Sequence, residues 1–422
     1  MTLIKSQSHK TKKRALLGQK KKTRKRRNKK ERQKQKQKEK EKEKEKEKVG
    51  GEAIGHGGFG CAFRPALKCK RASGRETDRV SKLMKKKYAE KEYEEITRFL
   101  PQLKEVPNYK RYYIIDDVTL CEPDDLTEED LVHFSSECKP MKKIKITKEN
   151  INSRLDELMI LNLPDGGMDV GHYVDRQLES KTFRFDQLNN MLIELLLHGI
   201  IPMNRINIYH GDIKESNILI GTDGYAKLID WGLSSKTDGE SIPKSFSNKP
   251  FQYNIPFTAI LFNGTFTYMF ENFYAKQKRK KANGSKSELL TMETVKSFVD
   301  SFIRKWNEER GEGHTKTFNK LIKLATDRKP LTVIVEYIAK VILHYGATAN
   351  ENWLMTYFKD VYLKNLDIWG LITSYSPVLE ETEDPQLKEI FSRFLYCPEN
   401  PHDVMNVDNV IRALTKKTIE LS

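Results

Sequence analysis

Two short segments in the middle of the chain carry residues whose types and spacing suit phosphoryl transfer. The segment HGDIKESNILI, residues 210–220, places Asp212 five residues ahead of Asn217, and Asp230 follows thirteen residues later in LIDWG. In one known pattern for moving a phosphoryl group, a carboxylate orients the attacking hydroxyl and an asparagine five residues later helps to hold magnesium. The spacing fits that pattern, and the glycine at position 211 is the feature that needs explaining.

A glycine-rich stretch near the start of the apolar part of the chain could hold phosphate groups. IGHGGFGCAF, residues 54–63, has the spacing G-x-G-x-x-G, which lets backbone amides approach phosphate oxygens with no Cβ in the way. Dinucleotide-binding folds share this spacing, but there it leads into a helix, whereas CAFRPALKCK contains Pro65 and lacks helical periodicity. The stretch therefore predicts a nucleotide-binding hairpin, with the candidate residues Ile54, Gly55, His56, Gly57, Gly58, Phe59, Gly60, Cys61 and Ala62.

The order of these motifs resembles the eukaryotic protein kinase superfamily over most of residues 51–422. VSK, residues 80–82, resembles the V-A-I-K strand of that family, and IDWG resembles its D-F-G motif, with Trp231 as the large apolar side chain behind Asp230. Several departures, among them GGFGCAFRPALKC, VSKL, IDWGLS and PFQYNIPF, resemble the divergent protein kinases of large DNA viruses. The resemblance implies an α+β fold of two lobes, a small β-rich one and a larger, mostly helical one, with ATP and Mg²⁺ or Mn²⁺ as cofactors.

The resemblance also implies a role for each matching residue. Asp212 would orient the substrate hydroxyl or accept its proton, and Asn217 and Asp230 would bind the metal ion. Lys214 and Lys82 would balance phosphate charge, and a glutamate of the following helix would hold Lys82. The glutamates of AEKEYEEI are at positions 90, 92, 94 and 95, and only one helix face can point at the lysine. We expect Glu92 to be this residue, with Glu95 as the next choice.

The segment LNLPDGG aligns with the hinge that holds adenine in protein kinases. This alignment places Leu161 at the gate of the adenine pocket, followed by Asn162. It places Pro164 where a backbone N–H normally meets the adenine ring, and proline has no such donor. We therefore expect adenine to be held by one hinge hydrogen bond and apolar packing.

Two other functions share part of this pattern. Small-molecule phosphotransferases of the aminoglycoside and choline kinase type resemble the chain through HGD, the following asparagine and IDW. Lys214, the three loop glycines and Gly232 favour a protein kinase, and a lysine two residues after the base is typical of Ser/Thr rather than Tyr substrates. A catalytically idle scaffold that acts through its basic tail is the other alternative, which the intact set of polar residues disfavours.

Three departures from the kinase pattern concern regulation and substrate binding. Gly211 replaces an arginine that in many protein kinases binds a phosphate group on the activation segment. We therefore expect the activation segment of this chain, residues 233–258, to adopt its active arrangement without phosphorylation. NKPFQYNIPFTAILF replaces the usual A-P-E ending. NLDIWGL resembles the D-x-W-S-x-G helix of that family, which implies that Asp367 anchors the loop beginning at residue 210 (the 210 loop) and that Trp369 packs in the helical core. An ordinary core helix with one capping aspartate is the alternative. An insertion of about a hundred residues, around 259–360, would then precede Asp367, partly helical and involved in binding.

The net charge of +17 comes from the first 50 residues, which hold 23 of the 76 basic and six of the 59 acidic residues. Residues 1–50 therefore predict a basic, low-complexity tail that is solvated or binds nucleic acid, another polyanion or acidic membrane. The rest of the chain is electroneutral, and its expected partner is a protein substrate. We expect a soluble intracellular protein, with the nucleus, a viral factory or the virion as locations that the tail permits. The sequence does not indicate an oligomeric state.

The folded part of the chain is expected to begin at about residue 51, with one lobe at 51–164 and the other at 165–422. Strands are expected near 80–84, 112–116, 157–163, 217–220 and 226–230. A Glu/Lys-rich helix is expected after the first strand, to about residue 100, and a long helix near 186–203. Five cysteines without a C-x-x-C pair argue against disulfides, so buried thiols are expected, with a zinc site as the alternative. No stretch has the length of a membrane span.

Overall fold

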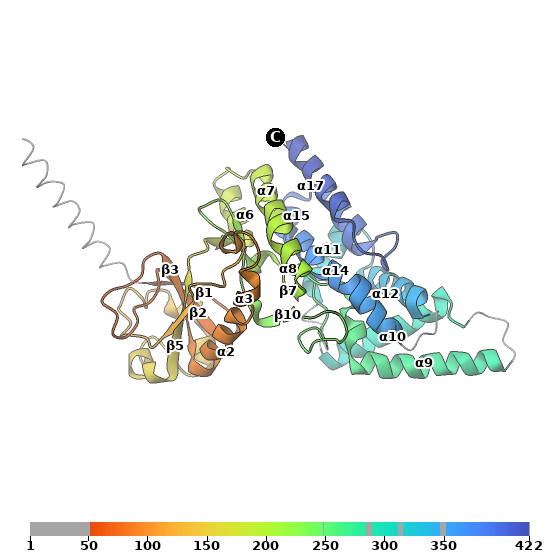
Figure 1. Ribbon diagram of the computed structural model, residues 1–422, viewed down its shortest axis with the longest axis horizontal. Coiled ribbons are helices and arrows are strands. Elements are labelled where there is room, and N and C mark those ends of the chain that lie inside the picture. The colour runs from red at the N-terminus through yellow and green to blue at the C-terminus, as the bar shows by residue number, and fades with distance from the viewer. Residues whose placement is uncertain (1–50, 248, 284–288, 311–314, 347–351, 422) are drawn as a thin grey trace, which may run out of the picture. The chain divides into compact units, whose positions relative to one another are not determined.

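The computed structural model describes residues 51–421 except for 248, 284–288, 311–314 and 347–351 (Figure 1). The described residues form two compact units, the first containing 51–89 and 119–163 and the second 90–118 and 164–421. The first unit is small and built on a β-sheet, and the second is larger and mostly helical, which confirms the predicted fold class. The predicted basic tail, residues 1–50, lies outside the described residues.

The first unit is built on a five-stranded sheet with the strand order β1-β2-β3-β5-β4. The glycine-rich stretch forms the turn of an antiparallel hairpin, in which the Gly57 N–H donates to the Gly60 carbonyl at 3.0 Å. Gly60 is required because a Cβ there would lie 2.8 Å from the Leu83 carbonyl oxygen. The strands are β1 Glu52–His56, β2 Gly60–Arg64, β3 Arg79–Lys85, β4 Thr119–Cys121 and β5 Leu158–Pro164.

The expectation of unpaired thiols is wrong for four of the five cysteines. Cys61 on β2 is joined to Cys138, and Cys69 is joined to Cys121 on β4, with Cα–Cα distances of 5.3 and 5.7 Å. The pairs span 77 and 52 residues of sequence, so local spacing could not reveal them. Cys138 is brought to β2 by a buried segment that contains the short helices α4 Phe134–Glu137 and α5 Lys139–Lys143.

Five short strands of the second unit frame the segment that was predicted to carry the chemistry. They form a three-stranded sheet, β6 Met168–Asp169, β8 Ile218–Ile220 and β9 Ala226–Leu228, and a pair, β7 Ile208–Tyr209 with β10 Ser235–Lys236. The strand predicted at 112–116 is absent. Tyr113 forms only an isolated parallel bridge with Leu228, because β9 ends there and offers no further ladder to pair with.

The helix predicted at 186–203 is continuous but not uniform. It runs as α7 Phe185–Leu195, one π-helical turn at Leu196–Ile200 and α8 Ile201–Arg205. The Glu/Lys-rich helix that was predicted to run to about residue 100 is α2 Lys86–Thr97. The other helices include α3 Leu100–Leu103, α6 Val170–Glu179, α14 Leu363–Thr373, α15 Ser376–Thr382, α16 Pro385–Phe391 and α17 Val407–Leu421.

The stretch predicted as a partly helical insertion is helical over most of its described residues. It contains α9 Gly264–Ala282, α10 Met292–Arg310, α11 Lys316–Thr326, α12 Pro330–Gly346 and α13 Trp353–Tyr357 (Figure 1). Helix α12 packs against α10, α11 and α13 and contributes a continuous set of buried aliphatic side chains. Across the described part of the chain, every helix is too short or too polar to cross a membrane.

Helix α14 lies in the interior of the second unit, and ten of its eleven residues are buried. Trp369 is fully buried, donates from Nε1 to the Tyr253 carbonyl at 2.9 Å, and meets the Phe257 ring edge to face at 5.2 Å. The prediction that Trp369 packs in the helical core is confirmed.

We expect Trp369→Ala to lower the free energy of unfolding of the second unit by about 3–5 kcal/mol, because it removes a large buried ring and leaves a carbonyl unpaired. Tyr268→Ala is the control, since Tyr268 on α9 is 69% exposed and its loss should change that free energy by less than about 0.5 kcal/mol. Urea denaturation measures both. Equal effects of the two substitutions would contradict the central position of α14.

Candidate active site

The carboxylate of Asp212 is held from several sides in the loop between β7 and β8. Lys214 Nζ donates to Oδ2 at 2.9 Å, and Asn217 Nδ2 donates to Oδ2 at 3.0 Å and to the Asp212 carbonyl at 2.8 Å. Asn254 Nδ2 donates to the other oxygen, Oδ1, at 2.9 Å. Three residues singled out from the sequence are thus brought together, and the orientation of a possible catalytic carboxylate is fixed.

Asn254 is a residue of this site that the sequence analysis missed. It lies in PFQYNIPF, is 2% exposed, and its amide also donates to the Ile213 carbonyl at 3.1 Å. The available signal was a polar residue in a run of aromatic and apolar ones, since a buried amide needs partners. Its contact with Asp212 spans 42 residues of sequence and could not be derived from local spacing.

Asn217 and Asp230 each offer a side-chain oxygen of the kind that binds magnesium together with phosphate. Because both donor hydrogens of the Asn217 amide point at Asp212, its Oδ1 is the atom available to a cation. Asp230 is exposed and sits in the left-handed region with φ of 65°, a conformation that costs free energy in a residue with a Cβ and that clusters at functional sites. Mg²⁺ usually takes one or two protein oxygens plus phosphates and water, which this pair fits. Among the described residues there is no cluster of three or more His, Cys, Asp or Glu side chains that would form a metal site unaided.

Asp367 anchors the 210 loop, as predicted. The alternative, in which Asp367 only caps its helix, is wrong. The backbone N–H of His210 donates to Oδ2 and that of Gly211 to Oδ1, both at 2.9 Å. Asp367 is 1% exposed, and this burial raises the pKa of its carboxyl group. Gly370 lets α14 approach closely, because a Cβ there would lie 2.6 Å from the Ile213 carbonyl oxygen.

The structure explains why position 211 is a glycine. Its φ is +70°, and a Cβ would lie 2.6 Å from the Phe246 ring. The Gly211 carbonyl accepts a hydrogen bond at 2.7 Å from Nζ of Lys249, which is 6% exposed. The ammonium group of Lys249 therefore contacts the backbone of residue 211 directly.

His210 connects this loop to the segment around Asp230. Its Nε2 lies 3.0 Å from the Ile229 carbonyl, and its ring centre lies 5.1 Å from that of Trp231. Complete burial lowers the pKa of His210, so a neutral ring that donates to this carbonyl fits the site. Trp231 is itself buried and donates from Nε1 to the Ile114 carbonyl at 3.3 Å.

The first unit contains the glycine-rich hairpin and Lys82. The Cβ that Gly57 lacks would lie 3.7 Å from Lys82 Nζ, so the turn of the hairpin lies close to this ammonium group. Glu92 belongs to the second unit, and its pairing with Lys82 stays a prediction. Within the second unit, Glu95 Oε2 would lie 3.2 Å from a Cβ on Gly232, which places its carboxylate beside the DWG segment.

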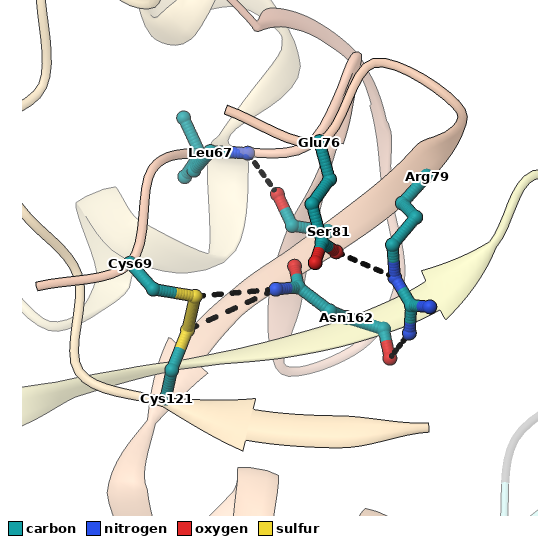
Figure 2. Close-up of a disulfide and its surroundings, with 7 residues drawn as sticks. All are labelled: Leu67, Cys69, Glu76, Arg79, Ser81, Cys121 and Asn162. Carbon is teal, nitrogen blue, oxygen red and sulfur yellow. Dashed lines mark hydrogen bonds and ion pairs between the residues drawn. A yellow bond between two sulfur atoms is a disulfide. The ribbon is translucent and has the colours of Figure 1, made fainter. Parts of the chain in front are cut away.

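The candidate adenine hinge lies on β5, where Leu161 is fully buried and pairs with Leu120 of β4. Asn162 pairs with Thr119, and Figure 2 shows its side chain between the Cys69–Cys121 disulfide and Arg79. Its Nδ2 lies 3.3 Å from Cys69 Sγ, and its carbonyl accepts from Arg79 at 3.3 Å. Pro164 is the last residue of β5, and the roles of these hinge residues toward adenine stay predictions.

Comparison with known proteins identifies the class. Residues 48–256 match the family described as "Protein kinase domain", which places this region in the eukaryotic-type protein kinase superfamily. The matched region ends two residues after Asn254 and before α9, so α9 to α13 lie beyond it, and the description of this stretch as an insertion stays a prediction. The resemblance to kinases of large DNA viruses stays a prediction.

Three curated relatives match over short stretches. The chain is 37% identical over 60 residues to the serine/threonine-protein kinase hippo of Drosophila melanogaster, which is 14% of this chain and 9% of that protein. It is 32% identical over 119 residues to cyclin-dependent kinase 12 of Caenorhabditis elegans, 24% and 16% of the two chains. It is 36% identical over 56 residues to the cytokinesis protein sepH of Aspergillus niger, 13% and 4%. The chain thus spans a small part of the length of these relatives.

We expect the buried Lys249 to make stability depend on pH. Burial lowers its pKa from 10.5 to about 8, while the carboxylates of Asp212 and Asp367 act in the opposite direction. Between these two pH values the unfolded chain binds the extra proton and the folded chain does not, so this lysine makes stability rise with pH there. The rise is at most on the order of 3 kcal/mol.

Urea denaturation from pH 7.5 to 10 should therefore show a steeper rise for the wild type than for Lys249→Met. Lys244→Met, at an exposed position of the same segment, is the control and should follow the wild type. Parallel curves for the wild type and Lys249→Met would show that Lys249 is not buried as described.

Proposed function

We propose that the chain is a Ser/Thr-type protein kinase that transfers the γ-phosphoryl group of Mg-ATP to a protein hydroxyl. The observation that carries the proposal is the Asp212 carboxylate, held on both oxygens by Lys214, Asn217 and Asn254 at 2.9–3.0 Å. A carboxylate with fixed orientation beside a lysine suits the alignment of a hydroxyl with a phosphoryl group. Membership of the protein kinase superfamily supports the same reaction.

Each polar residue has a distinct proposed role in this reaction. Asp212 orients the substrate hydroxyl and accepts its proton, and Lys214 steadies the transferring phosphoryl group. Asn217 and Asp230 bind the metal ion, which supplies neutralisation of charge on the phosphates. In the first unit, the hairpin amides and Lys82 hold the phosphates, with Glu92 as the residue that positions Lys82.

The Ser/Thr specificity rests on Lys214 and on the relatives. Lys214 Nζ donates to Asp212 Oδ2 two residues earlier, an arrangement in which it can reach both the base and a phosphoryl group. One matched relative is named as a serine/threonine-protein kinase. The substrate type and the cofactor of this chain are proposals, because the matched stretches cover little of this chain and little of its relatives.

We expect Asp212→Asn to reduce phosphoryl transfer at least about a thousandfold while leaving nucleotide affinity within about twofold, because the base acts on the hydroxyl and the phosphates are held elsewhere. Asp230→Ala should instead weaken Mg-ATP binding, since it removes a metal ligand. Radiolabelled ATP measures transfer to a mixture of acidic and basic proteins, and a fluorescent nucleotide measures binding. Retention of most activity by Asp212→Asn would remove this residue from its proposed role.

We also expect the activation segment to work without phosphorylation, because Lys249 and Phe246 already occupy the surroundings of Gly211. Protein made in bacteria and treated with phosphatase should transfer phosphate at its full initial rate. Joint replacement of Ser235, Ser241, Ser245 and Ser247, the serines of this segment that are not buried, by alanine should change the rate less than about twofold. Loss of activity on phosphatase treatment, reversed by phosphate at one of these serines, would contradict this account.

A further inference from the structure

A groove in the second unit lies between the helices of the insertion and the segment that contacts Asp212. It has a volume of about 480 Å³ and is lined by residues of α10, α11 and α12, by Thr315 and Lys329 just before α11 and α12, and by Phe251. Phe251, Phe318 and Ile334 form an apolar floor, on which the two aromatic rings lie 5.7 Å apart. Cavities of about 300–1,000 Å³ are of the size that binds small ligands and side chains.

The rim of this α10–α12 groove is positively charged. Lys320, Lys323 and Lys329 line it, and all three are exposed. Lys320 pairs with Glu380 at 2.9 Å, whereas Lys323 and Lys329 form no ion pair with any residue within the described ranges. An apolar floor under a cationic rim is complementary to a ligand that has a bulky apolar group flanked by negative charge.

The groove is connected to the candidate active site through four residues of the activation segment. Phe251 forms part of its floor, Tyr253 donates from its hydroxyl to Glu215 at 2.6 Å, and Asn254 donates to Asp212. Three residues of chain span at most about 10 Å, so a peptide whose hydroxyl meets Asp212 needs only a few more residues to reach the groove. Phe251 and Asn254 thus connect docking and chemistry within one segment.

We infer that the α10–α12 groove is a docking site for the protein substrate, and that it binds a bulky apolar side chain flanked by Asp or Glu. The inference rests on the proposed protein kinase function and names its substrate class. Acidic side chains meet the lysines of the rim, while the apolar side chain enters the groove above Phe251, Phe318 and Ile334, each of which is at most 3% exposed. A nucleic acid would use the rim alone and would leave the apolar floor without a partner.

Peptide binding tests the inference separately from catalysis. Fluorescence anisotropy measures binding of a labelled peptide with the sequence Glu-Glu-Phe-Glu-Glu to the full chain that carries Asp212→Asn. A peptide with Lys for each Glu and a peptide with Ala for Phe serve as comparisons. We expect the acidic peptide with Phe to bind at least about tenfold more tightly than either comparison, with an affinity that falls as salt increases.

Charge reversal locates the binding. Lys323→Glu with Lys329→Glu should weaken binding of the acidic peptide at least about tenfold, whereas Lys278→Glu with Lys280→Glu, on the exposed end of α9, should leave it within about twofold. Thermal unfolding at the wild-type temperature verifies that both double variants are folded. Equal affinity of the Asp212→Asn chain with and without the Lys323 and Lys329 substitutions would overturn the inference, as would tighter binding of a DNA oligonucleotide than of the peptide at these lysines.

The two proposals can fail separately. If the acidic peptide binds at the groove but the active chain phosphorylates no protein, the proposed kinase function is wrong. If the active chain phosphorylates proteins and the acidic peptide does not bind, the docking site is wrong.

Discussion

The buried carboxylate of Asp367 is the constraint on which the geometry of the candidate active site depends. Its two oxygens accept the backbone N–H groups of His210 and Gly211, the residues directly before Asp212. A carboxylate that is 1% exposed is unfavourable unless it is hydrogen-bonded, and each hydrogen bond to a charged group contributes about 1.5–3 kcal/mol. Helix α14 and the 210 loop therefore stabilise each other, and the position of Asp212 follows from the position of α14.

The loop is also held by the activation segment, through contacts that do not involve phosphate. Lys249 donates to the Gly211 carbonyl, Phe246 fills the space beside Gly211, and Asn254 donates to Asp212. Phe251, in the same segment, forms part of the floor of the α10–α12 groove. The segment that orients the proposed base therefore also lines the proposed substrate-docking site, so substrate binding and catalysis can be coupled through a few residues.

The residues of the candidate site that could be predicted from the sequence are those in short motifs with characteristic spacing. Asp212 and Asn217 could be singled out because five residues separate them, and Asp367 and Trp369 because NLDIWGL resembles a motif of the protein kinases. Asn254 and Lys249 were harder, because their contacts with the 210 loop join positions about forty residues apart and depend on the path of the activation segment. The cysteine pairs were predicted wrongly for the same reason, since only the tertiary fold brings Cys61 to Cys138 and Cys69 to Cys121. The prediction of a strand at 112–116 was wrong because a buried apolar run resembles a strand whether or not a neighbouring strand is present to pair with it.

The central claim is that this chain carries a working site for phosphoryl transfer to protein, anchored by Asp367. The most direct measurement is phosphoamino acid analysis after incubation of the full chain with γ-labelled ATP, magnesium and a mixture of protein substrates, compared with Asp367→Asn. The account predicts phosphoserine and phosphothreonine from the wild type and a loss of at least about tenfold in Asp367→Asn, because the amide side chain can no longer accept both backbone N–H groups. Label found only on small molecules, or equal transfer by the two proteins, would contradict it.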